Sequence, residues 1–313
     1  MSNEIEEIFK KHKMLNEIKN IKGYNVHERL NLYIDLGFKC NGNCDFCITR
    51  TKERYSEKRK TNLKNQLESL KKISGIYHSV EFVGGEPLLY CDNIRSMLEL
   101  IKCQKKVIVT NGIKTEWYSN IDLLEKFDHI DISRHSIDDF ENQKIIKSNN
   151  LLGLDDFKNM DNNIKEKIRI NITCFKCGID SVEKIERFID VFKSLGIKQF
   201  MFANLTNLIK DSFHDDSLVE YTTNNRISDK EFDSWQQTLI NKGYSLKKEI
   251  IGYAHFVKIL EKDGVTLVFK SNSEVNSAQT LINYYRENKC LLELVLAPNG
   301  DLFADWSYSQ KIE

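Results

Sequence analysis

The alternation of short strand-like runs with longer amphipathic segments is the feature that most limits how this chain can fold. Runs rich in β-branched and aromatic residues are typical of strands and cover residues 30–36, 79–85, 106–112, 129–133, 168–175 and 198–205. Amphipathic segments typical of helices lie between them, at about 60–74, 92–104, 119–127, 154–165 and 181–195. This order predicts parallel βαβ units in an α/β fold. A closed eight-stranded barrel would need further units, so we expect an open, partial (β/α)6 TIM-like barrel or a doubly wound sheet.

The pattern changes after residue 206. A helix is predicted over 228–242, and two strand pairs follow it, which turn at Asp263-Gly264 and at Asn299-Gly300. We therefore expect a small C-terminal β-hairpin subdomain beside the barrel. The expected parts are an N-terminal helical extension (1–29), the barrel core (30–245) and the C-terminal β subdomain (246–313).

Composition narrows the classes of function. Lys+Arg and Asp+Glu both number 46, and this balance gives no electrostatic reason to expect a nucleic acid or an anionic membrane as partner. No apolar run is long enough to span a bilayer, and the charged N-terminal segment lacks the apolar stretch of a signal peptide. We therefore expect a cytoplasmic protein, in which clustered cysteines bind metal or do chemistry rather than form disulfides.

Three of the eight cysteines stand together in "CNGNCDFC", as Cys40, Cys44 and Cys47. A structural zinc site normally closes with four ligands, so zinc would need His135 or a distant cysteine as well. An iron–sulfur cluster fits the set better, because cysteine is its usual ligand. Three cysteines on a four-iron cluster would leave one iron without a protein ligand, and that iron could bind a substrate.

The spacing Cys40-x3-Cys44-x2-Cys47, with Phe46 before the third cysteine and a strand before the first, resembles the signature loop of the radical S-adenosylmethionine (SAM) superfamily. The motif "GGEP" (84–87) follows the second predicted strand, where that family carries its SAM amino-group motif. The resemblance covers roughly residues 30–206. It implies that the three cysteines hold a [4Fe-4S] cluster and that SAM binds the free iron.

The resemblance also implies SAM contacts at the ends of successive strands, where α/β barrels place their sites. Glycines allow close backbone approach, and a carboxylate can pair with an ammonium group. On the fifth strand, alternation places Arg169, Asn171 and Thr173 on one face. His135 after Arg134 departs from the family's commoner Ser-x-Asp-Gly pattern. The expected cofactor-binding residues are Phe46, Gly84, Gly85, Glu86, Pro87, Thr110, Asn111, Ser133, Arg134 and Asn171.

The remaining cysteines divide by position. Cys91 and Cys103 flank a predicted helix and are expected in the core, and strand alternation points Cys174 away from the barrel interior. Cys177 and Cys290 are candidate catalytic hydrogen donors to a substrate radical, with small buried hydrophobes as the alternative interpretation.

The segment from Cys290 onward resembles the start of the twitch/SPASM-type extensions of peptide-modifying members. The chain has Asp305-Trp306 where those extensions carry another cysteine, so we do not expect a complete auxiliary cluster.

The function implied is reductive cleavage of SAM to a 5′-deoxyadenosyl radical that abstracts hydrogen from a substrate C–H bond, with flavodoxin or ferredoxin as the one-electron reductant. The expected substrate is a ribosomally made peptide, which would be epimerised or cross-linked, although no leader-binding domain is evident before residue 30. A small metabolite or nucleotide is the alternative. A non-catalytic iron–sulfur carrier or a zinc-binding module would leave "GGEP" and "TNG" (110–112), the motif at the end of the third predicted strand, without a purpose. The basic run 51–60 is either a solvated helix start or a patch for an acidic peptide, a nucleotide or a reductase.

Overall fold

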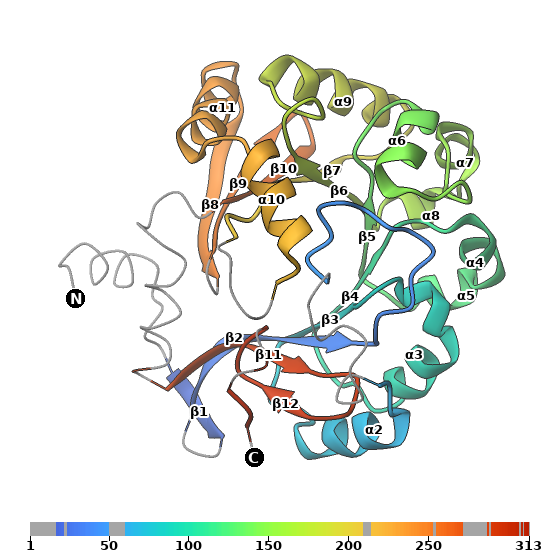
Figure 1. The fold of residues 1–313 in the computed structure, drawn as a ribbon, viewed down its shortest axis with the longest axis vertical. Helices are drawn as coiled ribbons and strands as arrows, with labels where there is room; N and C mark the ends of the chain where they lie inside the picture. Colours follow the sequence, from blue (N-terminus) through green and yellow to red (C-terminus); the bar gives the residue numbers. More distant parts are fainter. Residues whose placement is uncertain are drawn as a thin grey trace.

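The computed structural model describes residues 17–21, 24–49, 60–208, 214–252, 255–271, 287, 289–306, 308 and 310–312. Its centre is a run of parallel strands that are neighbours in chain order (Figure 1). They are β2 (Tyr24–Asp35), β3 (Ser79–Val83), β4 (Lys105–Thr110), β5 (His129–Ser133), β6 (Ile168–Cys174) and β7 (Gln199–Asn204). All six predicted strands are confirmed, as is the open α/β partial barrel.

Helices cover the outer face of this sheet (Figure 1). Those that follow β2 to β6 are α2 (Leu63–Lys72), η2 (Pro87–Tyr90), α3 (Cys91–Leu98), α4 (Lys114–Ser119), α5 (Ile121–Leu124), α6 (Asp139–Ile146), α7 (Leu154–Asn159), α8 (Asn162–Lys165) and α9 (Val182–Ser194). After β7 come α10 (Asp216–Asn225) and α11 (Asp229–Asn241). The expected helices are present, with 154–165 divided into α7 and α8 at Met160, whose backbone is extended. The sequence pattern did not predict α6 and α10.

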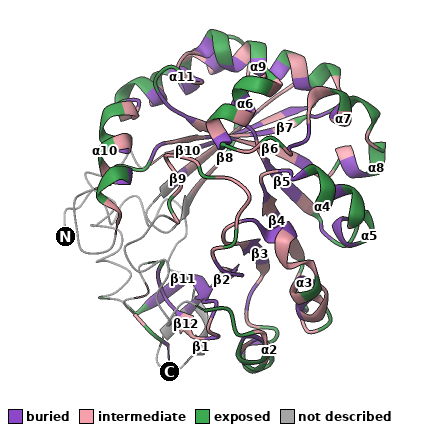
Figure 2. Cartoon of the chain, turned by 45° about the vertical axis from the view of Figure 1, so that its right-hand side comes forward, coloured by how far each residue is buried: buried purple, intermediate pink, exposed green. Residues whose placement is uncertain are grey.

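Side-chain alternation and spacing explain how these layers pack. On β6 the isoleucines and Cys174 are fully buried, whereas the other face is half-buried. On α9 the buried residues include Ile185, Phe188, Ile189 and Phe192, a helical spacing that turns one apolar stripe toward the sheet. Figure 2 shows the same division, with exposed residues on the outward sides of helices and buried ones along the strands.

The C-terminal strands extend the barrel sheet at both of its edges. The sheet continues past β7 through β10 (Val265–Ser271), β9 (His255–Lys262) and β8 (Ser245–Gly252), and past β2 through β11 (Cys290–Leu296) and β12 (Leu302–Phe303). The two predicted turns are confirmed, but β10 is parallel to β7 and β11 is parallel to β2. A six-stranded parallel sheet leaves two unpaired edges, and these strands satisfy the exposed backbone groups.

The start of the chain also differs from expectation. Part of the predicted N-terminal helical extension forms strand β1 (Glu17–Ile21), which pairs antiparallel with the beginning of β2. The rest, residues 1–16, lies outside the described part. No helix within the described ranges is long and apolar enough to cross a membrane.

Candidate functional site

The predicted motifs meet at the carboxyl ends of β2 to β6. The cysteine loop (residues 40–47) follows β2, "GGEP" follows β3, and "TNG" ends β4. Because these strands are parallel neighbours, their ends lie at one edge of the sheet (Figure 1).

The two glycines of "GGEP" let the backbone pack against the segment that leads into the cysteine loop. Gly85 N–H donates to the Gly37 carbonyl at 2.6 Å, and Glu86 N–H donates to the Lys39 carbonyl at 2.9 Å. A Cβ on Gly85 would lie 2.3 Å from the Lys39 oxygen, and Gly84 has a φ of +134°. We expected the glycines to admit a ligand; in the structure they admit the chain itself, and so fix where Cys40 begins.

Side chains from distant parts of the chain hold the same segment. Asp35, the last residue of β2, accepts from Gly37 N–H at 3.0 Å and from the Tyr308 hydroxyl at 2.5 Å. The Tyr90 hydroxyl accepts from Lys39 N–H at 2.9 Å. The start of the cysteine loop is therefore anchored by β2, by η2 and by the C-terminal segment.

Glu86 is buried and bonded to its neighbours. Its carboxylate accepts from Leu88 N–H at 2.9 Å, from the Thr110 hydroxyl at 2.6 Å and from Asn111 N–H at 2.7 Å. Burial raises the pKa of Glu86 to about 7, against the lowering effect of these hydrogen bonds. The carboxylate thus joins the end of β3 to the end of β4, and three bonds leave it further acceptor capacity.

The cysteine loop brings its three thiols into electrostatic contact. Burial, followed by the neighbouring Cys47 and Cys40, raises the pKa of Cys44 to about 12. The Asn111 amide nitrogen lies 3.8 Å from Cys40 Sγ and donates to Asn41 Oδ1 at 2.8 Å. Within the described residues no three His, Cys, Asp or Glu side chains are arranged to hold a single metal ion. Ligands of a four-iron cluster bind separate irons, so they do not need to converge on one point.

One flank of the cysteine loop rests on the end of α6, a contact that the sequence did not reveal. The Ile146 carbonyl accepts from Asn43 N–H at 2.9 Å and lies 3.6 Å from Cys44 Sγ. Asn41 donates to the Ser148 hydroxyl at 2.9 Å. The end of α6, a helix that the sequence pattern did not predict, therefore positions Asn43 and Cys44 of the cysteine loop.

The other flank carries an aromatic cluster around Phe46. Its ring lies 5.0 Å from the His135 ring, 5.5 Å from Phe175 and 6.3 Å from Tyr221 of α10 (centroid distances). Burial, followed by Arg134, lowers the pKa of His135 to about 3, so its imidazole is neutral. His135 Nδ1 accepts from Thr173 N–H at 3.1 Å. His135 is therefore a packed residue beside the loop.

The side chain of Arg134 forms its hydrogen bonds within the segment that follows β5. The buried guanidinium donates to the carbonyls of Ser136, Leu152 and Ile137 and to the Asp139 carboxylate, at 2.5–3.1 Å. The expected SAM contact has no support in this geometry, because burial and these bonds assign the side chain to the β5–α6 connection.

Ser133 and Asn171 are register partners on β5 and β6, and both are half-buried. Asn171 lies on the face of β6 opposite the buried isoleucines, as alternation predicted, and Ser133 is its register partner on the same face. Below them on the same face, Arg169 forms an ion pair with the fully buried Asp131. The inner face of the barrel therefore carries charged side chains toward the beginnings of β5 and β6 and polar side chains toward their carboxyl ends, near the predicted site.

The two candidate hydrogen donors lie at opposite ends of the strands. Cys177 is exposed in the loop after β6. Burial, followed by the charge of Asp45, raises the pKa of Tyr221 on the neighbouring α10. Cys290 begins β11 and pairs with Asn25 at the start of β2, roughly 30 Å from the cysteine loop at 3.3 Å per residue. The prediction for Cys290 is therefore wrong, because this cysteine starts a barrel strand and lies at the far edge of the sheet. Cys174 is fully buried toward the helices, as expected.

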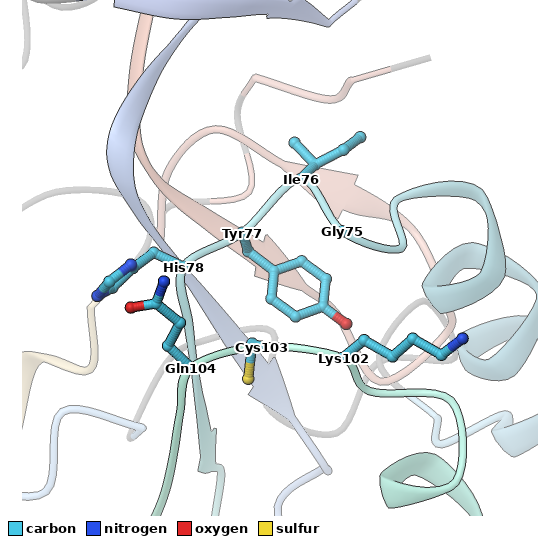
Figure 3. A pocket seen from close by; sticks show the side chains of 7 residues that line it. All are labelled: Gly75, Ile76, Tyr77, His78, Lys102, Cys103 and Gln104. Carbon is cyan, nitrogen blue, oxygen red and sulfur yellow. The ribbon is translucent and has the colours of Figure 1, made fainter.

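A shallow depression of about 480 Å³ also lies away from the site, at the beginnings of β3 and β4 (Figure 3). Residues 75–78 and 102–104 line it. Since these residues precede their strands, the depression belongs to the opposite end of the barrel.

Comparison with known proteins agrees with this arrangement. The model of the Radical SAM superfamily matches residues 34–221. Streptococcus suis SuiB bound to its precursor peptide SuiA superposes with a TM-score of 0.57 at 17% identity, over 98% of this chain and 63% of SuiB. SuiB bound to S-adenosylmethionine gives 0.57 at 18%, over 98% and 65%. The histidine-tagged anSMEcpe with bound AdoMet gives 0.53 at 13%, over 90% and 72%.

The chain thus spans less than two thirds of the length of SuiB. No curated protein sequence matches it. The solved structures share its open α/β fold, but the expected twitch/SPASM-type region is not confirmed, since β11 pairs with β2 as a barrel strand. The family match covers more than half of the chain and includes the cysteine loop, "GGEP" and "TNG", so this protein belongs to the radical SAM superfamily of enzymes.

Proposed function

We propose that this chain modifies a peptide by radical SAM chemistry, with the cofactors held at the carboxyl ends of β2 to β6. The observation that carries the proposal is the junction of three motifs: the Asn111 side chain of "TNG" contacts Cys40 and Asn41, and its backbone N–H donates to Glu86 of "GGEP". Three separate sequence signals thus converge on one group of atoms.

The residues present fit a [4Fe-4S] cluster and SAM. Cys40, Cys44 and Cys47 supply thiol ligands from one loop. Burial, followed by the nearby Cys47 and Cys40, raises the pKa of Cys44, and a cationic iron centre would stabilise the three groups as thiolates. Asn111 Oδ1 is buried without a hydrogen-bond partner among the described residues, as expected for a group that contacts a ligand.

The chain's own residues would bind and orient the cofactors. Glu86 has acceptor capacity left for an ammonium group, and it fixes Thr110 and Asn111 beside Cys40. Gly84, Gly85 and Pro87 set the path of that loop, Phe46 packs the far side, and Ser133 and Asn171 offer polar groups from the next strands. Bound together, the cluster and SAM would supply a 5′-deoxyadenosyl radical that removes hydrogen from a substrate C–H bond.

A peptide substrate is supported by the open barrel and by SuiB, a structure of the same fold that was solved with its precursor peptide. The Cys290 segment no longer supports it, because that segment is part of the barrel sheet. Free thiols and an iron–sulfur cluster require a reducing compartment, so we assign the reaction to the cytoplasm.

The test is anaerobic reconstitution with iron and sulfide, followed by SAM and dithionite. We expect 5′-deoxyadenosine from the native protein and none from Cys44→Ala. Candidate precursor peptides should increase the yield and gain a mass or stereochemical change, whereas an increase with small metabolites or nucleotides alone would replace the peptide assignment. Equal yields from native protein and Cys44→Ala would refute the cluster assignment.

A further inference from the structure

Two rows of side chains lie on the inner face of the barrel at the carboxyl ends of β5, β6, β7 and β10. The strand register pairs Ser133 with Asn171 in the lower row, and it joins Thr173, Ala203 and Lys270 in the upper row. Residues that pair in register point to the same face of a sheet. Lys270 of β10 therefore shares the inner face with Thr173 and lies two strands away from it.

The upper row begins beside the cysteine loop. Thr173 N–H donates to His135 Nδ1 at 3.1 Å, and the His135 ring lies 5.0 Å from the ring of Phe46. Neighbouring strands are about 4.8 Å apart, so Lys270 lies roughly 10 Å from Thr173 along the row. A molecule bound along the upper row would therefore extend from the predicted cofactors to Lys270.

The polar side chains of the two rows are available to a ligand. Ser133, Asn171, Thr173 and Lys270 are half-buried, and no hydrogen bond or ion pair joins their side chains to another residue that the structure describes. Polar groups inside a fold usually have such partners. Ala203 carries only a methyl group, which leaves room above the sheet between Thr173 and Lys270. The proposed function assigns Ser133 and Asn171 to SAM, so Thr173 and Lys270 are left for the substrate.

The positive charge of Lys270 acts across the barrel. Burial and then Asp131 raise the pKa of Glu81 on β3, whereas Arg169 and then Lys270 lower it. Because Lys270 influences a carboxyl group on the opposite wall, its side chain points inward. Within the described ranges Lys270 forms no ion pair, with Glu81 or with any other carboxylate. Its ammonium group is therefore free to bind an anionic group that enters the barrel.

The carboxylates on the inner face of the neighbouring strands do not offset this charge by contact. Asp131 on β5 is paired with Arg169, and Glu261 on β9 lies 3.8 Å from the ammonium of Lys247. Glu81 is deeper in the barrel, and burial, the largest influence on its pKa, favours its protonated form. The carboxyl end of β10 therefore presents a positive charge toward the upper row.

Lys270 also lies outside the segment that matches the radical SAM model, which is 34–221. Strand β7 belongs to that segment, and β10 is added to its edge in parallel. The matched segment contains the residues that would hold the cofactors. A side chain supplied by the added strand is therefore placed to determine which substrate this chain accepts.

We propose that Lys270 binds a carboxylate of the peptide substrate and that the Thr173 hydroxyl bonds to the peptide beside it. This inference rests on the proposed function, in which the substrate is a peptide. The carboxylate belongs either to an acidic side chain or to the C-terminus of the peptide, and both accept a charge-assisted hydrogen bond from an ammonium group. The hydroxyl can donate to a peptide carbonyl or accept from a peptide N–H.

The test is a calorimetric titration of reconstituted protein that contains SAM and no reductant. The probes are acetylated pentapeptides of alanine and glycine with one variable central residue. Three of them have an amidated C-terminus and a central glutamate, glutamine or lysine, and the fourth has a central glutamine and a free C-terminal carboxylate. We expect native protein to bind the glutamate probe or the free-carboxylate probe at least about tenfold more tightly than the amidated glutamine probe. The probe that binds more tightly identifies the source of the carboxylate.

Substitutions of Lys270 test whether this preference depends on its charge. Lys270→Gln should abolish the preference, Lys270→Arg should keep it, and Lys270→Glu should transfer it to the lysine probe. Lys198→Gln is the matched control, because Lys198 is an exposed lysine that precedes β7 at the other end of the same pair of strands. It should bind the probes as native protein does. Circular dichroism shows whether each variant is folded.

The binding results are independent of radical chemistry. Equal affinity of native protein for all probes, or no measurable binding of any of them, would overturn this inference. An unchanged preference in folded Lys270→Gln, or an equal loss in Lys198→Gln, would overturn it as well. A native protein that makes no 5′-deoxyadenosine with dithionite would refute the proposed function, whereas a preference that depends on Lys270 would still establish a carboxylate site.

Discussion

Gly85→Ala offers a direct test of the idea that the "GGEP" glycines position the cysteine loop. The added Cβ would lie 2.3 Å from the Lys39 carbonyl oxygen and 2.8 Å from two backbone carbons of residues 38 and 39. Ordinary contact is about 1 Å longer than the shortest of these, so a backbone segment has to move. No flexible side chain can absorb the overlap, because all three atoms belong to the main chain.

The size of the effect follows from what the movement breaks. Overpacking costs about 1–3 kcal/mol, and the Gly85–Gly37 and Glu86–Lys39 backbone hydrogen bonds contribute about 1 kcal/mol each. We therefore expect the free energy of unfolding to fall by roughly 3–5 kcal/mol. Because Lys39 precedes Cys40, iron content after reconstitution and SAM affinity should fall as well.

Gly75→Ala is the matched control. Gly75 has a φ of +77°, but a Cβ added there would have no atom within 4 Å, so alanine meets backbone strain of about 1–2 kcal/mol without a clash. Urea unfolding, iron analysis and SAM titration are compared for both variants. We expect Gly75→Ala to lose stability and keep its iron. Full iron content and SAM affinity in Gly85→Ala would refute the reasoning, whatever its stability.

Three further predictions concern single side chains. Arg134→Met should lower the free energy of unfolding by roughly 3 kcal/mol, because it removes hydrogen bonds to three carbonyls and a carboxylate. Arg134→Lys should not restore the lost stability. A loss of SAM affinity at unchanged stability would instead make Arg134 a SAM contact. Burial raises the pKa of Glu86 from 4.5 to about 7, so the folded state binds this proton more tightly than the unfolded state. The free energy of unfolding, measured with urea, should therefore fall as pH rises through that interval and then level off. Glu86→Gln should flatten this pH dependence, and an unchanged pH dependence would assign it to other groups. If Cys177 returns hydrogen to the substrate, product formed in D2O should contain deuterium in native protein and in Cys290→Ala but not in Cys177→Ala, and deuterium retained in all three would exclude Cys177.

Helices and strands were predictable from the sequence where their apolar residues recur at regular spacing. The strands β2 to β7 alternate clearly or are apolar throughout, and α9 repeats its buried residues at helical spacing. The helix α6 was missed because one of its two buried residues is Asn142, which accepts from His135 N–H, so its sequence lacks an apolar stripe. The C-terminal hairpins were found, but their partners were not, because pairing with β2 and β7 depends on which edges the barrel leaves open.

The site was predictable to the level of its motifs. Cys40, Cys44, Cys47 and Glu86 meet where parallel strands end, which chain order alone predicts. The bonds of Arg134 were not predictable, because position after a strand does not tell whether a side chain turns toward the site or into its own loop. Tyr308 carried no signal at all, since its contact with Asp35 spans 273 positions of sequence.

The contacts that residues near β11 and β12 make with the end of β2 affect when the site can form during synthesis. Gln66 donates to the carbonyls of Asp35 and Ala297, and Tyr308 donates to Asp35, so the base of the cysteine loop is completed only by residues that are made 231 or more positions later. Contacts of such long sequence separation form late, because closing the loop costs entropy before any contact repays it. A nascent chain that has released only its first two hundred residues would carry the cysteines without their final support. Iron loading should therefore follow the synthesis of β11 and Tyr308, and variants that slow docking of β11 should accumulate as folded but iron-poor protein.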